Sequence, residues 1–160
     1  MAVEAGSAAP AFELMTGASQ RISLASLRGS KVVLYFYPKD DTSGCTREAI
    51  AFNALKADFA AADTAIVGVS ADDVVSHDRF KAKHGLSLTL AADPEKSAID
   101  AYGVWVEKSM YGRKYMGIER ATFLIDETGK VAQVWRKVRV PGHAEEVLAA
   151  ARSLAAREAS

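Results

Sequence analysis

The single cysteine of this 160-residue chain, Cys45, is the side chain best suited to nucleophilic chemistry. It follows an apolar run and a short polar loop, and we predict that it lies in the first turn of a helix. There, unpaired backbone N–H groups and the positive end of the helix dipole favour a negative charge, and the thiolate is the reactive form of cysteine. Because the chain has no second cysteine, no disulfide can form within it, and any redox cycle must be completed by another molecule.

The alternative role for a lone cysteine is that of a small buried hydrophobe, since most free cysteines are buried and inert. The residues before Cys45 argue against it. They include a proline, two aspartates, a threonine and a glycine, and a core position rarely begins with such a segment. The context therefore favours a functional thiol.

Apolar runs and helical periodicity along the chain predict an α/β protein. Buried strands at 32–37 and 64–70 flank a predicted helix at 43–62, and such a crossover makes the two strands parallel. A hairpin of strands at 120–126 and 130–137 adds antiparallel pairing. We therefore predict a thioredoxin-like fold, in which a central mixed β-sheet has helices on both faces. The remaining predicted elements are a loose lead-in at 1–11, an N-terminal β-hairpin extension with strands at 12–14 and 21–24 around a turn at 16–19, a helix at 74–84, a strand at 87–91, a short helix at 97–102 and a final helix at 143–158.

This order of elements places Cys45 at the carboxyl end of a central strand, the edge where open α/β sheets bind ligands. A thiolate that attacks a peroxide needs the O–O bond aligned with sulfur, and donors for the charge growing on the leaving oxygen. Thr42 offers a hydroxyl that can donate and accept, and it can also serve as the helix N-cap. Pro38 can shield the sulfur from water, or simply end the strand because it lacks a backbone donor.

Composition narrows the class of protein. Twenty Lys and Arg residues balance twenty Asp and Glu residues, so the net charge of zero gives no support to a nucleic-acid or membrane partner. The length suggests one domain over residues 1–160. The first seven residues have neither a basic region nor an apolar core, which argues against a secretory signal and for a cytoplasmic protein.

Other possible sites have weaker support. We interpret His77, His84 and His143 as solvated residues or caps and predict no metal site, because no cysteine or paired ligand lies near them in the sequence. No glycine-rich pattern indicates a phosphate or dinucleotide loop, so we expect no cofactor. The basic and aromatic run at 111–115 could contact RNA, but the zero net charge argues against that.

The residues around Cys45 resemble a known family. Pro38, Thr42 and Cys45 match the PxxxTxxC motif of the peroxiredoxins, and residues 35–46, YFYPKDDTSGCT, resemble the peroxiredoxin Q or bacterioferritin comigratory protein branch. The likeness covers most of the chain and extends to three further segments, LRGSKVVL at 27–34, KSMYGRKYMGIERATFLID at 108–126 and RKVRVPGH at 136–143.

The resemblance implies a role for each matching residue. Cys45 would be the peroxidatic cysteine, which is oxidised to sulfenic acid, while Thr42 would hold the peroxide oxygens and Pro38 would shield the pocket. Arg120 matches the arginine that stabilises the thiolate and orients the substrate, although at the start of a strand it could equally be a solvated edge charge. Glu48 resembles the glutamate that positions this arginine; its alternative role is to complement the helix dipole.

Two positions depart from the branch. Ile50 stands where many members carry a resolving cysteine, so the resemblance is to a one-cysteine type. Without a resolving cysteine, the sulfenic acid must react with an external thiol. At the second position, Ser43 replaces the usual proline, which weakens rigidity before the helix but keeps a capping hydroxyl.

We therefore predict a thiol-dependent peroxidase, a peroxiredoxin, that reduces hydrogen peroxide and organic hydroperoxides. Its reductant would be a thioredoxin, glutaredoxin or glutathione system, and the protein would be a monomer or weak homodimer. One alternative is a non-enzymatic redox sensor that relays oxidation to a partner through a mixed disulfide. Another is a thioredoxin-like binding module with an inert cysteine, which the presence of Thr42 and Pro38 opposes.

Overall fold

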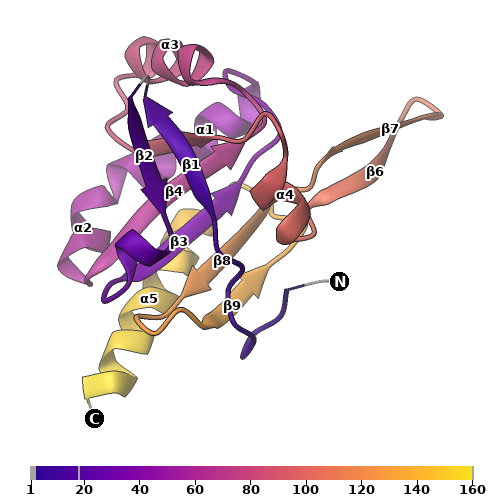
Figure 1. Ribbon diagram of the computed structural model, residues 1–160. Helices are drawn as coiled ribbons and strands as arrows, with labels where there is room; N and C mark the ends of the chain where they lie inside the picture. The colour runs from indigo at the N-terminus through magenta and orange to yellow at the C-terminus, as the bar shows by residue number, and fades with distance from the viewer. Residues whose placement is uncertain (1–2, 18, 160) are drawn as a thin grey trace.

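The computed structural model describes residues 3–17 and 19–159. Parts of the predicted lead-in and of the turn at 16–19 lie outside these residues. In the described part of the chain, seven strands form one mixed sheet in the order β2-β1-β5-β4-β3-β8-β9, and two more form a separate hairpin (Figure 1). The strands are β1 (Glu13–Gly17), β2 (Gln20–Ser23), β3 (Lys31–Phe36), β4 (Thr64–Ser70), β5 (Thr89–Ala92), β6 (Trp105–Met110), β7 (Arg113–Ile118), β8 (Ala121–Ile125) and β9 (Val131–Trp135).

The centre of the sheet has the predicted topology. β3 pairs in parallel with β4, and β4 with β5, while β8 joins β3 antiparallel and continues into β9. The helices are α1 (Ser43–Ala54), α2 (Lys56–Ala61), α3 (Val74–His84), α4 (Ser97–Ala101) and α5 (His143–Ala159), with a short 3₁₀ helix η1 (Ala25–Leu27). None of the helices in the described residues is long and apolar enough to cross a membrane.

Strand β3 divides the core into two layers because successive side chains point to opposite faces. Val33 and Tyr35 face a layer made with helices α1, α2, α3 and α5. Leu34 and Phe36 face a layer closed by α4, the N-terminal segment and the base of the β6–β7 hairpin. Helices therefore cover both faces, as predicted, with four of those described on the face that contains Cys45.

The predicted helix at 43–62 is wrong in one respect, because it breaks at Leu55 into α1 and α2. Leu55 has φ −100° and ψ 6°, outside the helical range. Contacts with the loop after α3 stabilise this break between the two helices. Asn53 accepts a hydrogen bond from the backbone N–H of Ser87 at 2.8 Å, and Lys56 donates to the Ser87 carbonyl at 3.0 Å. These are contacts between distant residues, so helical periodicity does not reveal them.

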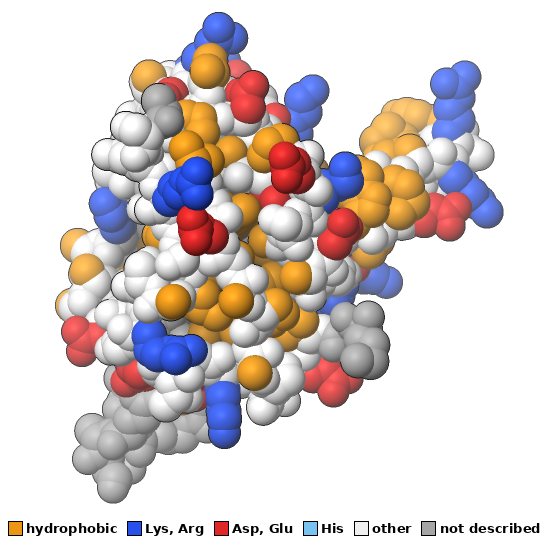
Figure 2. Space-filling view, in the orientation of Figure 1, with side chains coloured by type: hydrophobic (Ala, Val, Ile, Leu, Met, Phe, Trp, Pro, Cys, Tyr) orange, Lys and Arg blue, Asp and Glu red, His pale blue; other side chains and the backbone are white. Residues whose placement is uncertain are grey.

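The β6–β7 hairpin is an element that the sequence analysis did not predict. It turns at Tyr111 and Gly112, both with positive φ, and projects from the body of the protein (Figure 1). Its outer half carries exposed Met110, Tyr115 and Met116, so it lacks the buried, alternating pattern typical of a core strand. Figure 2 shows hydrophobic side chains gathered on this hairpin and charges of both signs spread over the rest of the face.

Candidate active site

Cys45 occupies the third position of α1, directly beyond the carboxyl end of β3. The backbone N–H of Thr46 donates to the Thr42 carbonyl at 2.8 Å and starts the helical hydrogen-bond pattern. The Cys45 side chain is only 1% exposed and belongs to the same core layer as Tyr35 and Phe52. The sulfur therefore lies at a helix N-terminus with apolar walls, where little water screens a nearby charge.

Arg120 supplies that nearby charge. Its Nη2 lies 3.3 Å from the Cys45 Sγ, and its Nη1 donates to Glu48 Oε1 at 2.7 Å. Arg120 directly precedes β8, and the pairing of Phe36 with Ala121 brings this strand start beside the end of β3. The interpretation of Arg120 as a solvated edge charge is wrong, because its side chain is largely buried and contacts both groups.

Gly44 leaves room for this guanidinium. A Cβ atom at position 44 would lie 3.1 Å from Arg120 Nη2, closer than ordinary packing allows. A side chain there would require the guanidinium to shift by a few tenths of an ångström. The glycine directly before Cys45 was a sequence signal for a close neighbour, but the sequence does not show which residue that neighbour is.

Glu48 is buried one helical turn after Cys45, and burial raises its pKa to about 7 despite the opposing effect of Arg120. Its Oε2 has no hydrogen-bond partner among the described residues. The Glu48 carboxyl and the Cys45 sulfur therefore contact two different nitrogens of one guanidinium, and the fork geometry of its donors orients Arg120 between them. Glu48 therefore does more than complement the helix dipole, because it forms an ion pair with Arg120.

We expect Glu48→Gln to remove a pH dependence of the free energy of unfolding. Between pH 4.5, the ordinary pKa of the side chain, and about 7, the folded protein retains a proton that the unfolded chain releases. Relative to Glu48→Gln, wild type should therefore lose stability as pH rises through this window, by about 3 kcal/mol in total. Urea unfolding from pH 4 to 8 measures the effect, with Glu95→Gln on the surface as the matched control. Parallel profiles for wild type and Glu48→Gln would contradict the prediction.

Thr42 and Pro38 lie in the loop that joins β3 to α1. Thr42 occupies the N-cap position, but its side chain makes no capping hydrogen bond, and its hydroxyl instead donates to the Lys39 carbonyl at 2.9 Å. Thr42 is exposed, and Pro38 is half-buried at the bend that follows β3. The structure thus brings Cys45, Glu48 and Arg120 into contact, whereas Thr42 directs its hydroxyl to the loop backbone.

The interpretation of His77 and His143 as solvated residues or simple caps is wrong, because both are buried. His143 starts α5 and shares a hydrogen bond of 2.8 Å with the Thr122 hydroxyl, and its ring packs edge-on against Phe52 and Trp135. Burial lowers the pKa of His143. The sequence analysis did not predict that these two histidines are buried, because only the tertiary fold shows which side chains are enclosed.

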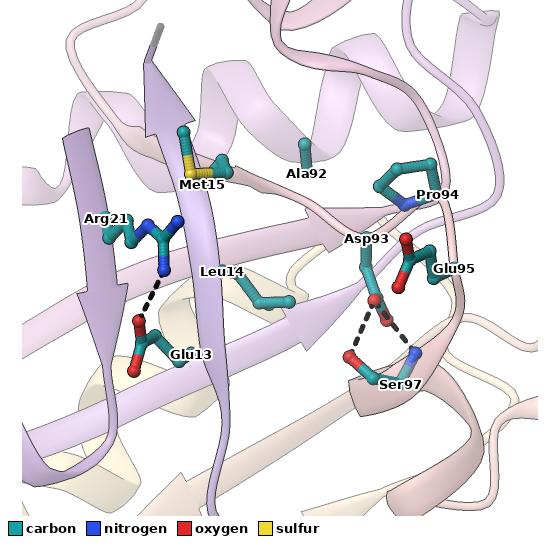
Figure 3. Close-up of a pocket in the computed structure, with 9 residues that line it drawn as sticks. All are labelled: Glu13, Leu14, Met15, Arg21, Ala92, Asp93, Pro94, Glu95 and Ser97. Atoms are coloured by element: carbon teal, nitrogen blue, oxygen red, sulfur yellow. Dashed lines mark hydrogen bonds and ion pairs between the residues drawn. The ribbon is translucent and has the colours of Figure 1, made fainter. Parts of the chain in front are cut away.

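A separate cavity of about 310 Å³ opens where β1 meets the end of β5, and Cys45 does not line it (Figure 3). Four of its polar side chains, those of Glu13, Arg21, Asp93 and Ser97, are already engaged. Asp93 accepts hydrogen bonds from the backbone and hydroxyl of Ser97 at the start of α4, and Arg21 pairs with Glu13. These interactions hold elements of the fold together, so the cavity offers no competing site.

A buried cysteine at a helix start, in contact with an arginine at the edge of a thioredoxin-like sheet, defines a thiol-based redox protein. Comparison with known proteins narrows this class. The sequence model of the AhpC/TSA family matches residues 5–134. Peroxiredoxin Bcp of Bacillus subtilis is 45% identical over 148 residues, which are 92% of this chain and 94% of the relative.

A sequence and a solved structure from Xanthomonas campestris give the same result. Its peroxiredoxin Bcp is 48% identical over 136 residues, 85% of this chain and 84% of that one. A solved structure of its bacterioferritin comigratory protein superposes with a TM-score of 0.85 at 45% identity, covering 90% and 92% of the two chains. The chain belongs to the AhpC/TSA family, within the branch of Bcp and peroxiredoxin Q. It is a thiol-dependent peroxidase, and the resemblance inferred from its motifs is confirmed.

Proposed function

We propose that Cys45 is the peroxidatic cysteine and that it reduces hydrogen peroxide and alkyl hydroperoxides. The observation that carries the proposal is the 3.3 Å contact between Arg120 and the Cys45 sulfur. The solved Xanthomonas relative supports the substrate class, since it was described for alkyl peroxide reduction. No residue besides Cys45 in this chain can form a sulfenic acid.

The chemistry follows from this arrangement. The Cys45 thiolate attacks one peroxide oxygen, an S–O bond forms, and the O–O bond breaks. The electron pair of that bond leaves with the second oxygen, which takes a proton and departs as water or an alcohol. Arg120 stabilises the thiolate and the charge that develops on the leaving oxygen. Thr42 holds the peroxide oxygens after a rotation of its hydroxyl away from Lys39, and Pro38 shields the sulfur from bulk water.

An external thiol then completes the cycle. It attacks the sulfenic sulfur and releases water to form a mixed disulfide, and a second thiol releases reduced Cys45 as it forms the product disulfide. Dependence on such a thiol fits a reducing compartment, so we place the protein in the cytoplasm. We propose that it acts as a monomer or weak homodimer built from one domain.

The environment of Ile50 is consistent with external resolution. Ile50 lies in α1 and is 46% exposed, so it does not pin the helix to the core. Five residues along a helix correspond to a rise of about 7.5 Å and a rotation of about 500°, which turns position 50 about 140° away from Cys45. Since Cys45 faces the core, Ile50 faces solvent. The chain therefore places no reactive group where the branch often carries its resolving cysteine.

The fate of the sulfenic acid tests the proposal. We expect peroxide-treated wild type to keep the mass of one chain and to be captured by dimedone at Cys45. Excess peroxide without thiol should advance it to sulfinic acid, whereas an added thiol should give a mixed disulfide at Cys45. Intact-mass spectrometry distinguishes these products, and a Cys45–Cys45 dimer as the main product would overturn external resolution. Steady-state turnover with thioredoxin, glutaredoxin and glutathione systems side by side identifies the reductant.

A further inference from the structure

The loop between Pro38 and Thr42 is attached to the body of the protein by a buried carboxylate that the proposed chemistry does not use. Asp40 Oδ1 accepts a hydrogen bond from the Tyr37 hydroxyl at 2.6 Å. Asp40 Oδ2 accepts from the Ser76 hydroxyl at 2.8 Å and lies 2.7 Å from His77 Nδ1. The Asp40 side chain is only 4% exposed, so these contacts are shielded from water.

His77 completes this cluster and is held at both ends of its ring. Nδ1 faces the Asp40 carboxylate, and Nε2 lies 3.0 Å from the Ala91 carbonyl in β5. The Tyr37 hydroxyl also lies 3.3 Å from Nδ1. Burial alone would raise the pKa of Asp40, but the hydrogen bonds from His77 and Tyr37 outweigh it and lower the pKa. Asp40 and His77 therefore form a buried, hydrogen-bonded pair of side chains.

The pair joins three parts of the structure. Asp40 lies between Pro38 and Thr42, His77 lies in α3, and the carbonyl bound by His77 lies in β5. The Asp40 backbone N–H also donates to Asp72 Oδ2 at 2.8 Å. The next residue, Asp41, adopts a positive φ of 59°, a conformation that needs support from its surroundings. The position of the loop thus depends on contacts at Asp40.

We propose that the buried Asp40–His77 pair is a positioning device that holds the Pro38–Thr42 loop in the geometry needed for peroxide attack by Cys45. The proposal rests on the function assigned above to that loop. Neither residue touches the sulfur in the described contacts, so they act through the loop. A displacement of about 1 Å in a reacting geometry can cost on the order of 10²-fold in rate, so such support is valuable.

The chain offers a matched control beside this pair. Asp41 forms contacts with the same helix, to Lys83 at 2.7 Å and to His84 at 2.8 Å, but its side chain is 42% exposed. An exposed pair of this kind contributes little because solvent screens it. Asp41→Asn and His84→Gln therefore replace the same two residue types, in the same loop and helix, without disturbing the buried cluster.

The test compares two reactions of the same sulfur. In Asp40→Asn and in His77→Gln, we expect the second-order rate constant for Cys45 oxidation by hydrogen peroxide to fall about tenfold or more. Alkylation of Cys45 by iodoacetamide needs no peroxide positioning and should stay within about twofold of wild type. The two control variants should match wild type in both reactions. Equal losses in oxidation and alkylation, or no loss of oxidation, would overturn the proposal.

A further variant keeps the result decisive. If a variant fails to fold, Tyr37→Phe removes one hydroxyl donor to Asp40 and should still slow oxidation about threefold without slowing alkylation; unchanged oxidation would overturn the proposal. Wild type that formed no sulfenic acid at all would instead contradict the proposed function.

Discussion

Replacement of Cys45 with serine is expected to abolish peroxide consumption. A serine hydroxyl is a far weaker nucleophile than a cysteine sulfur, and the chain has no other cysteine to replace it. Turnover should therefore fall to the background of the assay, as is typical when a catalytic nucleophile is removed. The measurement is steady-state peroxide consumption with an excess of the thiol reductant that supports wild type.

This variant should remain folded. Cys45 is enclosed in the core, so a serine there places a hydroxyl in an apolar layer, at a cost of about 1–3 kcal/mol. Arg120 keeps its ion pair with Glu48 and stays in place. Circular dichroism and thermal unfolding provide the control, with a modest decrease in melting temperature expected. Turnover that survived in a folded Cys45→Ser protein would show that the chemistry occurs elsewhere.

Replacement of Arg120 with alanine is expected to give the second largest effect. It removes the cation 3.3 Å from the sulfur, to which we assign the stabilisation of the thiolate and of the transition state. The rate constant for sulfenic acid formation should fall on the order of 10²-fold. Stopped-flow fluorescence, or competition for peroxide with a second peroxidase, measures this step without the reductant.

The fold should tolerate this change because Glu48 can become neutral. Its pKa is about 7 beside Arg120 and would rise further without the cation, so the buried carboxyl would hold a proton. Arg120→Lys keeps the positive charge and should retain only part of the rate. A single ammonium group cannot contact the sulfur and the carboxylate at once, as the two nitrogens of a guanidinium do. Arg136→Ala removes a similar ion pair, with Glu119 at 2.8 Å, and serves as the matched control. Equal rate constants for sulfenic acid formation in Arg120→Ala and Arg136→Ala would show that Arg120 has no specific role in the oxidation of Cys45.

The local pattern of the sequence determined the part of the site around Cys45. A continuous apolar run predicted strand β3, and the polar loop with its PxxxTxxC motif predicted a cysteine at a helix start, as the structure has it. The predicted bounds of β4 and α3 agree with the structure. These features depend on residues close together in the chain, so propensity and spacing are sufficient to reveal them.

The tertiary structure alone decided which distant residues meet the cysteine. Arg120 lies 75 residues from Cys45, and it reaches the sulfur only because β8 pairs with β3 in one register. The burial of His77 depends likewise on the packing of α3 against β5 and the loop at Asp40. A single sequence contains no measure of distance between such segments. Strand register and helix packing set that distance, and each results from the burial of many apolar side chains at once.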